Sequence, residues 1–176
     1  MQYEFPDGTR LFFDGRNMKG CRNEFASYAH GSKGSAVIST MAHTPGITRI
    51  YKGQKMPRVM NRKELPLPPD PNLAWAFPQP EKSPYDWEWD DLFEAIRQDK
   101  PYNEVKRGAE ASLVASMGRM AAHTGQIVTF DQILNCQHEF APGVDKLIMD
   151  GPAPLQLGPD GKYPVPQPGI LTDREY

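Results

Sequence analysis

Three polar side chains near the amino terminus have the chemistry expected of a substrate-binding site. Arg16 and Asn17 follow a strand-like run, and His30 stands directly before a glycine-bounded turn. An arginine offers a planar fork of N–H donors that suits carboxylates and hydroxyl-rich molecules, while a histidine can donate or accept a hydrogen bond. Arg16, Asn17 and His30 are therefore the candidate substrate-binding residues. The alternative for each is a solvated strand end.

The turn after His30, Gly31-Ser32-Lys33-Gly34, invites comparison with a phosphate-binding loop. Such a loop is longer and leads into a helix, whereas the strand-like run SAVIST follows here. The spacing therefore predicts a hairpin turn. The sequence identifies no catalytic residue and no cofactor-binding residue.

The cysteines and histidines give little support for a metal site. Cys136 and His138 are closer together than the ligands of most structural zinc sites, and no C-x-x-C pair accompanies them. Joining them to Cys21 and His30 would give four ligands, but we expect no metal. Two cysteines are too few for a disulfide framework, although they could form a single disulfide bond. The cysteine content therefore does not identify the cellular compartment of the protein.

The elements that must position these residues begin with strands. The run MQYEFPDGTRLFF predicts a β-hairpin about Pro6-Asp7-Gly8. Residues 24–30 and 35–40 predict a second strand pair, and residues 47–53 a further strand. The connections are too short for parallel crossovers, so antiparallel pairing is expected.

Three helices are predicted after the strands. The first begins at Ser83-Pro84, runs to Lys100-Pro101 and carries an apolar stripe expected to be buried, with Trp89 rather than Trp87 inside. The second runs from Asn103 to a left-handed cap at Gly125. The third has capping-box spacing from Thr129. The stripes are Trp89, Leu92, Phe93 and Ile96 in the first helix, and Val105, Ala109, Leu113, Met117 and Met120 in the second.

Two regions of the chain are rich in proline. Eight prolines lie within residues 57–84 and seven within 142–168, which predicts extended segments that stay outside a central sheet. We expect an α+β domain over residues 1–141, with a proline-rich extended connection at 57–83, and an extended tail at 142–176 that wraps a neighbour or stays loose. The fold class is an open, mainly antiparallel β-sheet with helices packed on one face. A second copy is expected to cover the other face.

The bulk composition narrows the choice of partners. The chain has 176 residues, with 20 basic and 22 acidic side chains, so it lacks the positive patch expected of a nucleic-acid or membrane-surface protein. No apolar run approaches the roughly 20 residues of a transmembrane helix. The expected partners are a small molecule and a second copy, with no nucleic acid and no membrane.

The order of motifs resembles one enzyme family. DLFEAIR, KPYNE and GAEASLVASMGRMAAHTGQIVTFDQIL, preceded by EFPDGTRLFF and HGSKGSAV and followed by GKYPVPQPGI, are similar to the carboxy-terminal domain of Gfo/Idh/MocA oxidoreductases, in the bacterial subgroup with proline-rich tails. The resemblance implies an antiparallel sheet flanked by helices that binds substrate and builds the oligomer. It also implies NAD or NADP as the cofactor of the intact enzyme, bound by a separate Rossmann domain.

The sequence also differs from the family pattern. No Rossmann glycine fingerprint and no Glu-Lys-Pro motif is found, so the chain is expected to be the second domain alone and, by itself, inactive. Trp89 stands where relatives often have histidine. The implied function is the substrate-binding and oligomerisation domain of an NAD(P)-dependent oxidoreductase acting on a sugar or polyol derivative. The alternatives are a non-catalytic binding or assembly module and an NAD-assisted glycosidase-like enzyme.

Overall fold

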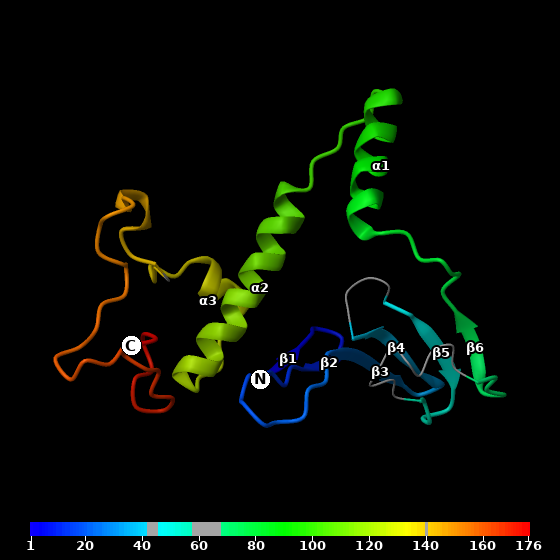
Figure 1. Ribbon diagram of the computed structural model, residues 1–176, viewed down its shortest axis with the longest axis horizontal. Coiled ribbons are helices and arrows are strands. Elements are labelled where there is room, and N and C mark those ends of the chain that lie inside the picture. The colour runs from blue at the N-terminus through cyan, green and yellow to red at the C-terminus, as the bar shows by residue number, and fades with distance from the viewer. Residues whose placement is uncertain (42–45, 58–67, 140) are drawn as a thin grey trace. The chain divides into compact units, whose positions relative to one another are not determined.

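The structure is a computed structural model that describes residues 1–41, 46–57, 68–139 and 141–176. The chain divides into two compact units. The first unit consists of Met1–Arg16 together with Asn103–Tyr176, and the second unit is Asn17–Tyr102. Figure 1 shows the strands and helices of both units.

The predicted fold class is confirmed as α+β with antiparallel sheets. The second unit contains a four-stranded sheet in the order β3-β4-β5-β6, and the first unit contains the two-stranded sheet β1-β2. Every pairing in both sheets is antiparallel. The strands of the larger sheet follow chain order, because each connection returns to the neighbouring position: β3 is Ala26–Gly31, β4 is Gly34–Thr40, β5 is Arg49–Lys52 and β6 is Leu73–Ala76.

The predicted turn between β3 and β4 is confirmed. Gly31 pairs with Gly34, so Ser32 and Lys33 form a two-residue hairpin turn that leads into a strand. A Cβ atom on Gly34 would collide with the carbonyl oxygen of Tyr51. Glycine at this position therefore lets β5 pair closely with the start of β4.

The four-stranded sheet has two different faces. One face buries Val37 and Tyr51, which are 1% and 2% exposed. On the opposite face Ile50 lies directly across from Trp75, and both are nearly half exposed. Ile38, two residues beyond the Ala36 that pairs with Ile50, is 49% exposed. We call Ile38, Ile50 and Trp75 the apolar sheet face.

The edge strand β6 was not among the predicted strands. It lies inside the proline-rich connection predicted at 57–83, of which residues 58–67 lie outside the described part of the chain. Leu73–Ala76 is a proline-free run between Pro71 and Pro78, and it pairs with β5 at the sheet edge. Edge positions tolerate nearby proline because only one side of the strand needs a complete hydrogen-bond ladder.

Helix α1 spans Pro84–Arg97, with Ser83 at its N-cap and a proline in its first turn. The helix was predicted correctly, but its end and its burial were not. It ends before Lys100, because Gln98 and Asp99 leave the helical conformation, the latter at φ 52°. The predicted buried stripe is wrong, since no residue of α1 is buried. Trp89 is 57% exposed and stacks on Phe93 at 5.8 Å between ring centroids. Packing of helices on one face of the sheet stays a prediction.

In the first unit the predicted hairpin forms from β1, Gln2–Glu4, and β2, Arg10–Phe12. It contacts helix α2, Val105–Thr124, through Tyr3, whose hydroxyl donates to the carbonyl oxygen of Val114 at 3.1 Å. Gly118 faces the same contact. A Cβ atom there would collide with the Tyr3 hydroxyl and the Met1 sulfur, so this glycine permits the hairpin to lie against the helix.

Burial along α2 is confined to its second half. Gly118, Met120 and Thr124 are buried, whereas Val105, at the start of the predicted stripe, is 76% exposed. The prediction for the first turns of α2 is therefore wrong. Gly125 closes the helix in the left-handed conformation at φ 70°, as predicted.

Helix α3, Phe130–Leu134, is held by the predicted capping box. Thr129 Oγ1 accepts from the backbone of Gln132 at 3.2 Å, and the Gln132 side chain accepts from the Thr129 backbone at 2.8 Å. A short 3-10 helix follows at Val144–Lys146. Of the helices within the described ranges, none has both the length and the apolar content needed to span a bilayer.

Candidate functional site

The predicted site residue His30 lies at the rim of an open depression at one end of the four-stranded sheet. The depression measures about 430 Å³ and is lined by His30, Gln54, Lys55, Met56, Pro57 and Asp70. Four of these residues are polar or charged. Together they offer an imidazole, an amide, an ammonium group and a carboxylate, which can donate to and accept from a hydroxyl-rich ligand.

Hydrogen bonds fix the orientation of His30 and Gln54. The Nδ1 atom of His30 lies 3.0 Å from Gln54 Oε1, and Gln54 Nε2 donates to the carbonyl oxygen of Gly31 at 2.7 Å. Because the Gln54 oxygen accepts, His30 Nδ1 is the donor, and Nε2 of the ring is the acceptor in the neutral histidine. The histidine thus offers an acceptor from a fixed position at the end of β3.

Asp70 is held by the turn that precedes β6. Its Oδ1 accepts from the backbone N–H of Asn72 at 2.7 Å, and its carbonyl accepts from Leu73 at 3.0 Å. Burial raises the pKa of the Tyr51 hydroxyl; Arg49 opposes this rise, whereas the Asp70 charge adds to it. Asp70 therefore acts electrostatically on the sheet as well as lining the depression.

The three predicted site residues are divided between the two units. Arg16 belongs to the first unit, while Asn17 and His30 belong to the second. Arg16 and Asn17 are both exposed and outside any strand, and neither lines the depression. His30 therefore lies at this depression, whereas Arg16 and Asn17 do not.

A buried arginine lies on the covered face of the same sheet. Arg49 is 4% exposed, and its Nη2 is 3.5 Å from Thr40 Oγ1. Within the described part of the chain, its Nε and Nη1 atoms have no hydrogen-bond partner. A buried charge without a partner is costly, so this residue is a point of weakness in the sheet.

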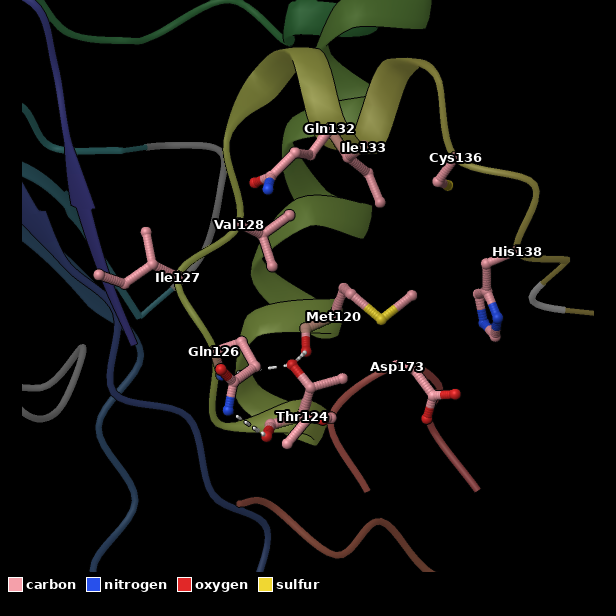
Figure 2. A pocket seen from close by; sticks show the side chains of 11 residues that line it. Met120, Thr124, Gln126, Ile127, Val128, Gln132, Ile133, Cys136, His138 and Asp173 are labelled. Carbon is pink, nitrogen blue, oxygen red and sulfur yellow. Dashed lines mark hydrogen bonds between the residues drawn. The ribbon is translucent and has the colours of Figure 1, made fainter. Parts of the chain in front are cut away.

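The first unit has its own pocket, of about 340 Å³, beside the end of α2 (Figure 2). Met120 and Ile133 point toward it from α2 and α3, and His138 and Asp173 stand at one side. The C-terminal segment therefore contributes part of the wall. The lining residues are Met120, Thr124, Gln126, Ile127, Val128, Gln132, Ile133, Cys136, His138, Thr172 and Asp173.

Next to this pocket the carboxylate of Glu175 is bound by three side chains. Its Oε1 lies 2.6 Å from Arg119 Nε and 2.5 Å from His123 Nδ1. Its Oε2 lies 3.0 Å from Arg119 Nη2 and 3.3 Å from His138 Nε2. Glu175 is 1% exposed. The tail predicted at 142–176 thus ends against α2 of its own chain.

We expect docking of the C-terminal segment to depend on pH. Burial raises the pKa of the Glu175 carboxyl, but hydrogen bonds from Arg119, His138 and His123 outweigh it and lower the pKa below its ordinary value of 4.5. A lowered carboxyl pKa contributes stability above pH 4.5 that is lost as the pH falls through the folded-state pKa. We expect the Gly169 N–H, which donates to the Thr124 carbonyl at 2.8 Å, to change its NMR shift as the pH falls below 4.5.

A Glu175→Gln variant is the control for this titration. Because its side chain carries no titrating proton, the step below pH 4.5 at Gly169 should disappear. An identical pH step in the variant would show that another group controls docking of the segment.

Only part of these contacts could be anticipated from local sequence patterns. Arg119 and His123 are four residues apart on α2, a spacing that places side chains on one helix face. Their common partner Glu175 lies more than 50 residues further along the chain, and no local pattern connects it to them. Gln54 and Asp70 at the depression likewise follow turns whose position in space depends on strand pairing.

Neither of the two cysteines, Cys21 and Cys136, forms a disulfide. Across the residues that the structure describes, no group of three or more histidine, cysteine, aspartate or glutamate side chains is arranged to hold a metal ion.

The fold defines a class of protein but no family. It is an α+β chain whose larger sheet is antiparallel and built from strands in sequence order. No family model, curated protein or solved structure matches the chain.

Proposed function

We propose that this chain is the carboxy-terminal substrate-binding and oligomerisation domain of an NAD(P)-dependent oxidoreductase that acts on a sugar or polyol derivative. The resemblance of its motif order to Gfo/Idh/MocA oxidoreductases supports the enzyme class. The observation that carries the assignment to this domain is the four-stranded antiparallel sheet, with an apolar face exposed and a polar depression at one end.

The apolar sheet face supports the oligomerisation role. Ile38, Ile50 and Trp75 are 49%, 44% and 45% exposed, and the sheet register places Ile50 beside Trp75. Trp75 also contacts Phe77 edge to face at 6.1 Å between ring centroids. Exposed apolar residues grouped in this way mark interaction surfaces. The proposed occupant is a second copy of the chain, since an isologous contact pairs one apolar face with the same face of its partner.

The depression at His30 supports the substrate class. A sugar or polyol offers several hydroxyl groups, each of which can donate and accept a hydrogen bond. The acceptor on His30, the ammonium of Lys55 and the carboxylate of Asp70 provide both kinds of partner around one hollow. These residues would bind and orient the substrate.

The residues that the structure describes do not fit a nicotinamide cofactor. A dinucleotide site uses a glycine-rich turn between a strand and the start of a helix. Along the described ranges, no glycine-rich turn occupies that position, and Gly31 and Gly34 lie in a strand-to-strand hairpin. We therefore assign no step of hydride transfer to these residues, and nucleotide binding belongs to a different domain in this proposal.

Polyol binding by the chain tests the substrate role. We expect a panel of sugars and polyols to contain ligands that bind the chain in NMR titrations and shift the resonances of His30 and Gln54. The His30→Ala variant should weaken that binding about 2- to 10-fold, because one net hydrogen bond contributes about 0.5–1.5 kcal/mol.

Lys33→Ala is the matched control, because Lys33 is exposed on the adjacent turn and does not line the depression. Its affinity should equal that of the wild type. The substrate role fails if no member of the panel shifts the resonances of His30 and Gln54. It fails also if His30→Ala binds the ligand as tightly as Lys33→Ala does.

A further inference from the structure

The cluster around Glu175 combines a covered carboxylate with reachable partners. The Glu175 side chain is 1% exposed, whereas the side chains of Arg119, His123 and His138 are 42%, 30% and 21% exposed. Solvent, and a dissolved ion, can therefore approach the three partners although the carboxylate between them is covered.

The geometry of the partners is that of an oxyanion site. Each oxygen of Glu175 contacts one arginine nitrogen and one histidine nitrogen. A forked arginine contact of this kind binds carboxylate and phosphate groups alike, because both present two oxygens in one plane. Arg119 and His123 are fixed one helical turn apart on α2, so these two donors keep their spacing whether or not an anion lies between them.

The occupant, by contrast, belongs to an irregular segment. Glu175 lies outside any helix or strand, and the segment leading to it is joined to α2 by the hydrogen bond from Gly169 to Thr124. Irregular segments open locally at a smaller free-energy cost than packed helices and strands. A rigid set of donors is thus filled by a carboxylate that can leave without unfolding α2.

We propose that Arg119, His123 and His138 form an oxyanion-binding cradle in which Glu175 is a tethered occupant, and that the carboxylate or phosphate group of a small organic acid replaces it. His138 also lines the pocket beside α2. A ligand held by its oxyanion in the cradle can therefore place its organic part over Met120 and Ile133. The C-terminal segment then acts as a built-in competitor for this site.

Inorganic phosphate is the probe that tests this proposal. In the wild-type chain phosphate must displace a carboxylate whose effective concentration, set by the tether, is on the order of millimolar. Glu175→Ala removes that competitor and leaves the donors in place. We expect phosphate, titrated by NMR against the resonances of His123 and His138, to bind at least about 10-fold more tightly to the variant.

Three further variants are the controls for the phosphate titration. Asp150→Ala removes an exposed carboxylate from the C-terminal segment that does not line the pocket, and it should bind phosphate as the wild type does. Arg119→Ala combined with Glu175→Ala should lose the gain, because the forked donor is gone. Glu175→Gln, which keeps the shape of the side chain, should show a smaller gain and guards against loss of local structure in the alanine variant; far-UV circular dichroism checks that α2 is retained.

A second titration, with acetate in place of phosphate, distinguishes carboxylate ligands from phosphate ligands. Equal gains for acetate and phosphate assign the cradle to both oxyanions, and a gain for one alone assigns it to that class. If Glu175→Ala binds neither anion more tightly than the wild type, or if the gain persists without Arg119, the cradle serves only to hold the tail and the proposal is wrong.

Discussion

Replacing Arg49 by methionine is expected to stabilise the second unit by about 1–3 kcal/mol, which is the cost of leaving buried polar groups unpaired. The guanidinium is 4% exposed, and two of its nitrogens have no partner within the described chain. Methionine keeps an unbranched side chain of similar length and removes the charge. Urea unfolding should show a higher midpoint with an unchanged slope.

Tryptophan fluorescence follows this transition selectively. The chain has three tryptophans, and Trp75, Trp87 and Trp89 all lie in the second unit. Arg97→Met is the matched control, since this arginine lies in the same unit and is exposed; its replacement should change the unfolding free energy by less than about 0.5 kcal/mol. A loss of more than about 1 kcal/mol in Arg49→Met would show that the guanidinium has a stabilising partner in solution.

Placing a charge on the apolar sheet face is expected to abolish self-association. Ile50 is central to this face, opposite Trp75. Burying an isoleucine contributes about 1.5–3 kcal/mol, and in a two-fold interface the change occurs in both copies. Ile50→Glu should therefore raise the dissociation constant of a dimer by at least about 100-fold.

The control for this variant carries the same added charge elsewhere. Thr9→Glu adds one negative charge at an exposed position of the β1–β2 hairpin, in the other unit. It should associate like the wild type. Equal weakening in both variants would assign the effect to net charge rather than to the sheet face.

Features decided by neighbouring residues were predictable from the sequence. The Thr129 capping box, the left-handed cap at Gly125 and the hairpin turn at Ser32-Lys33 all form as expected. Each depends on chemistry within four or five residues, where a side chain or a glycine satisfies the local backbone. The α+β class followed because strand patterns precede helix patterns along the chain.

Burial was harder to predict because it depends on what lies opposite. The stripe through Trp89 and Phe93 has the spacing of a buried helix face, yet α1 buries no residue. In β5 the alternation predicts two faces but not their surroundings: Arg49 is on the covered face, while Ile50 is exposed. Periodicity identifies a face, and only the packing partner decides whether that face is covered.

The candidate sites show the same limit. His30 was recognisable from its position before a turn, but Gln54 and Asp70 reach it only through the pairing of β4, β5 and β6. The Glu175 cluster depends on a contact between α2 and the last residues of the chain, for which the sequence carries no local signal.

Sedimentation equilibrium of the wild-type chain beside Ile50→Glu tests the proposed domain role most directly. We predict that the average mass of the wild-type chain rises with concentration toward twice the chain mass, while Ile50→Glu keeps the mass of a single chain over the same range. A wild-type chain that stays at the single-chain mass up to the highest concentration would contradict the oligomerisation role of the sheet.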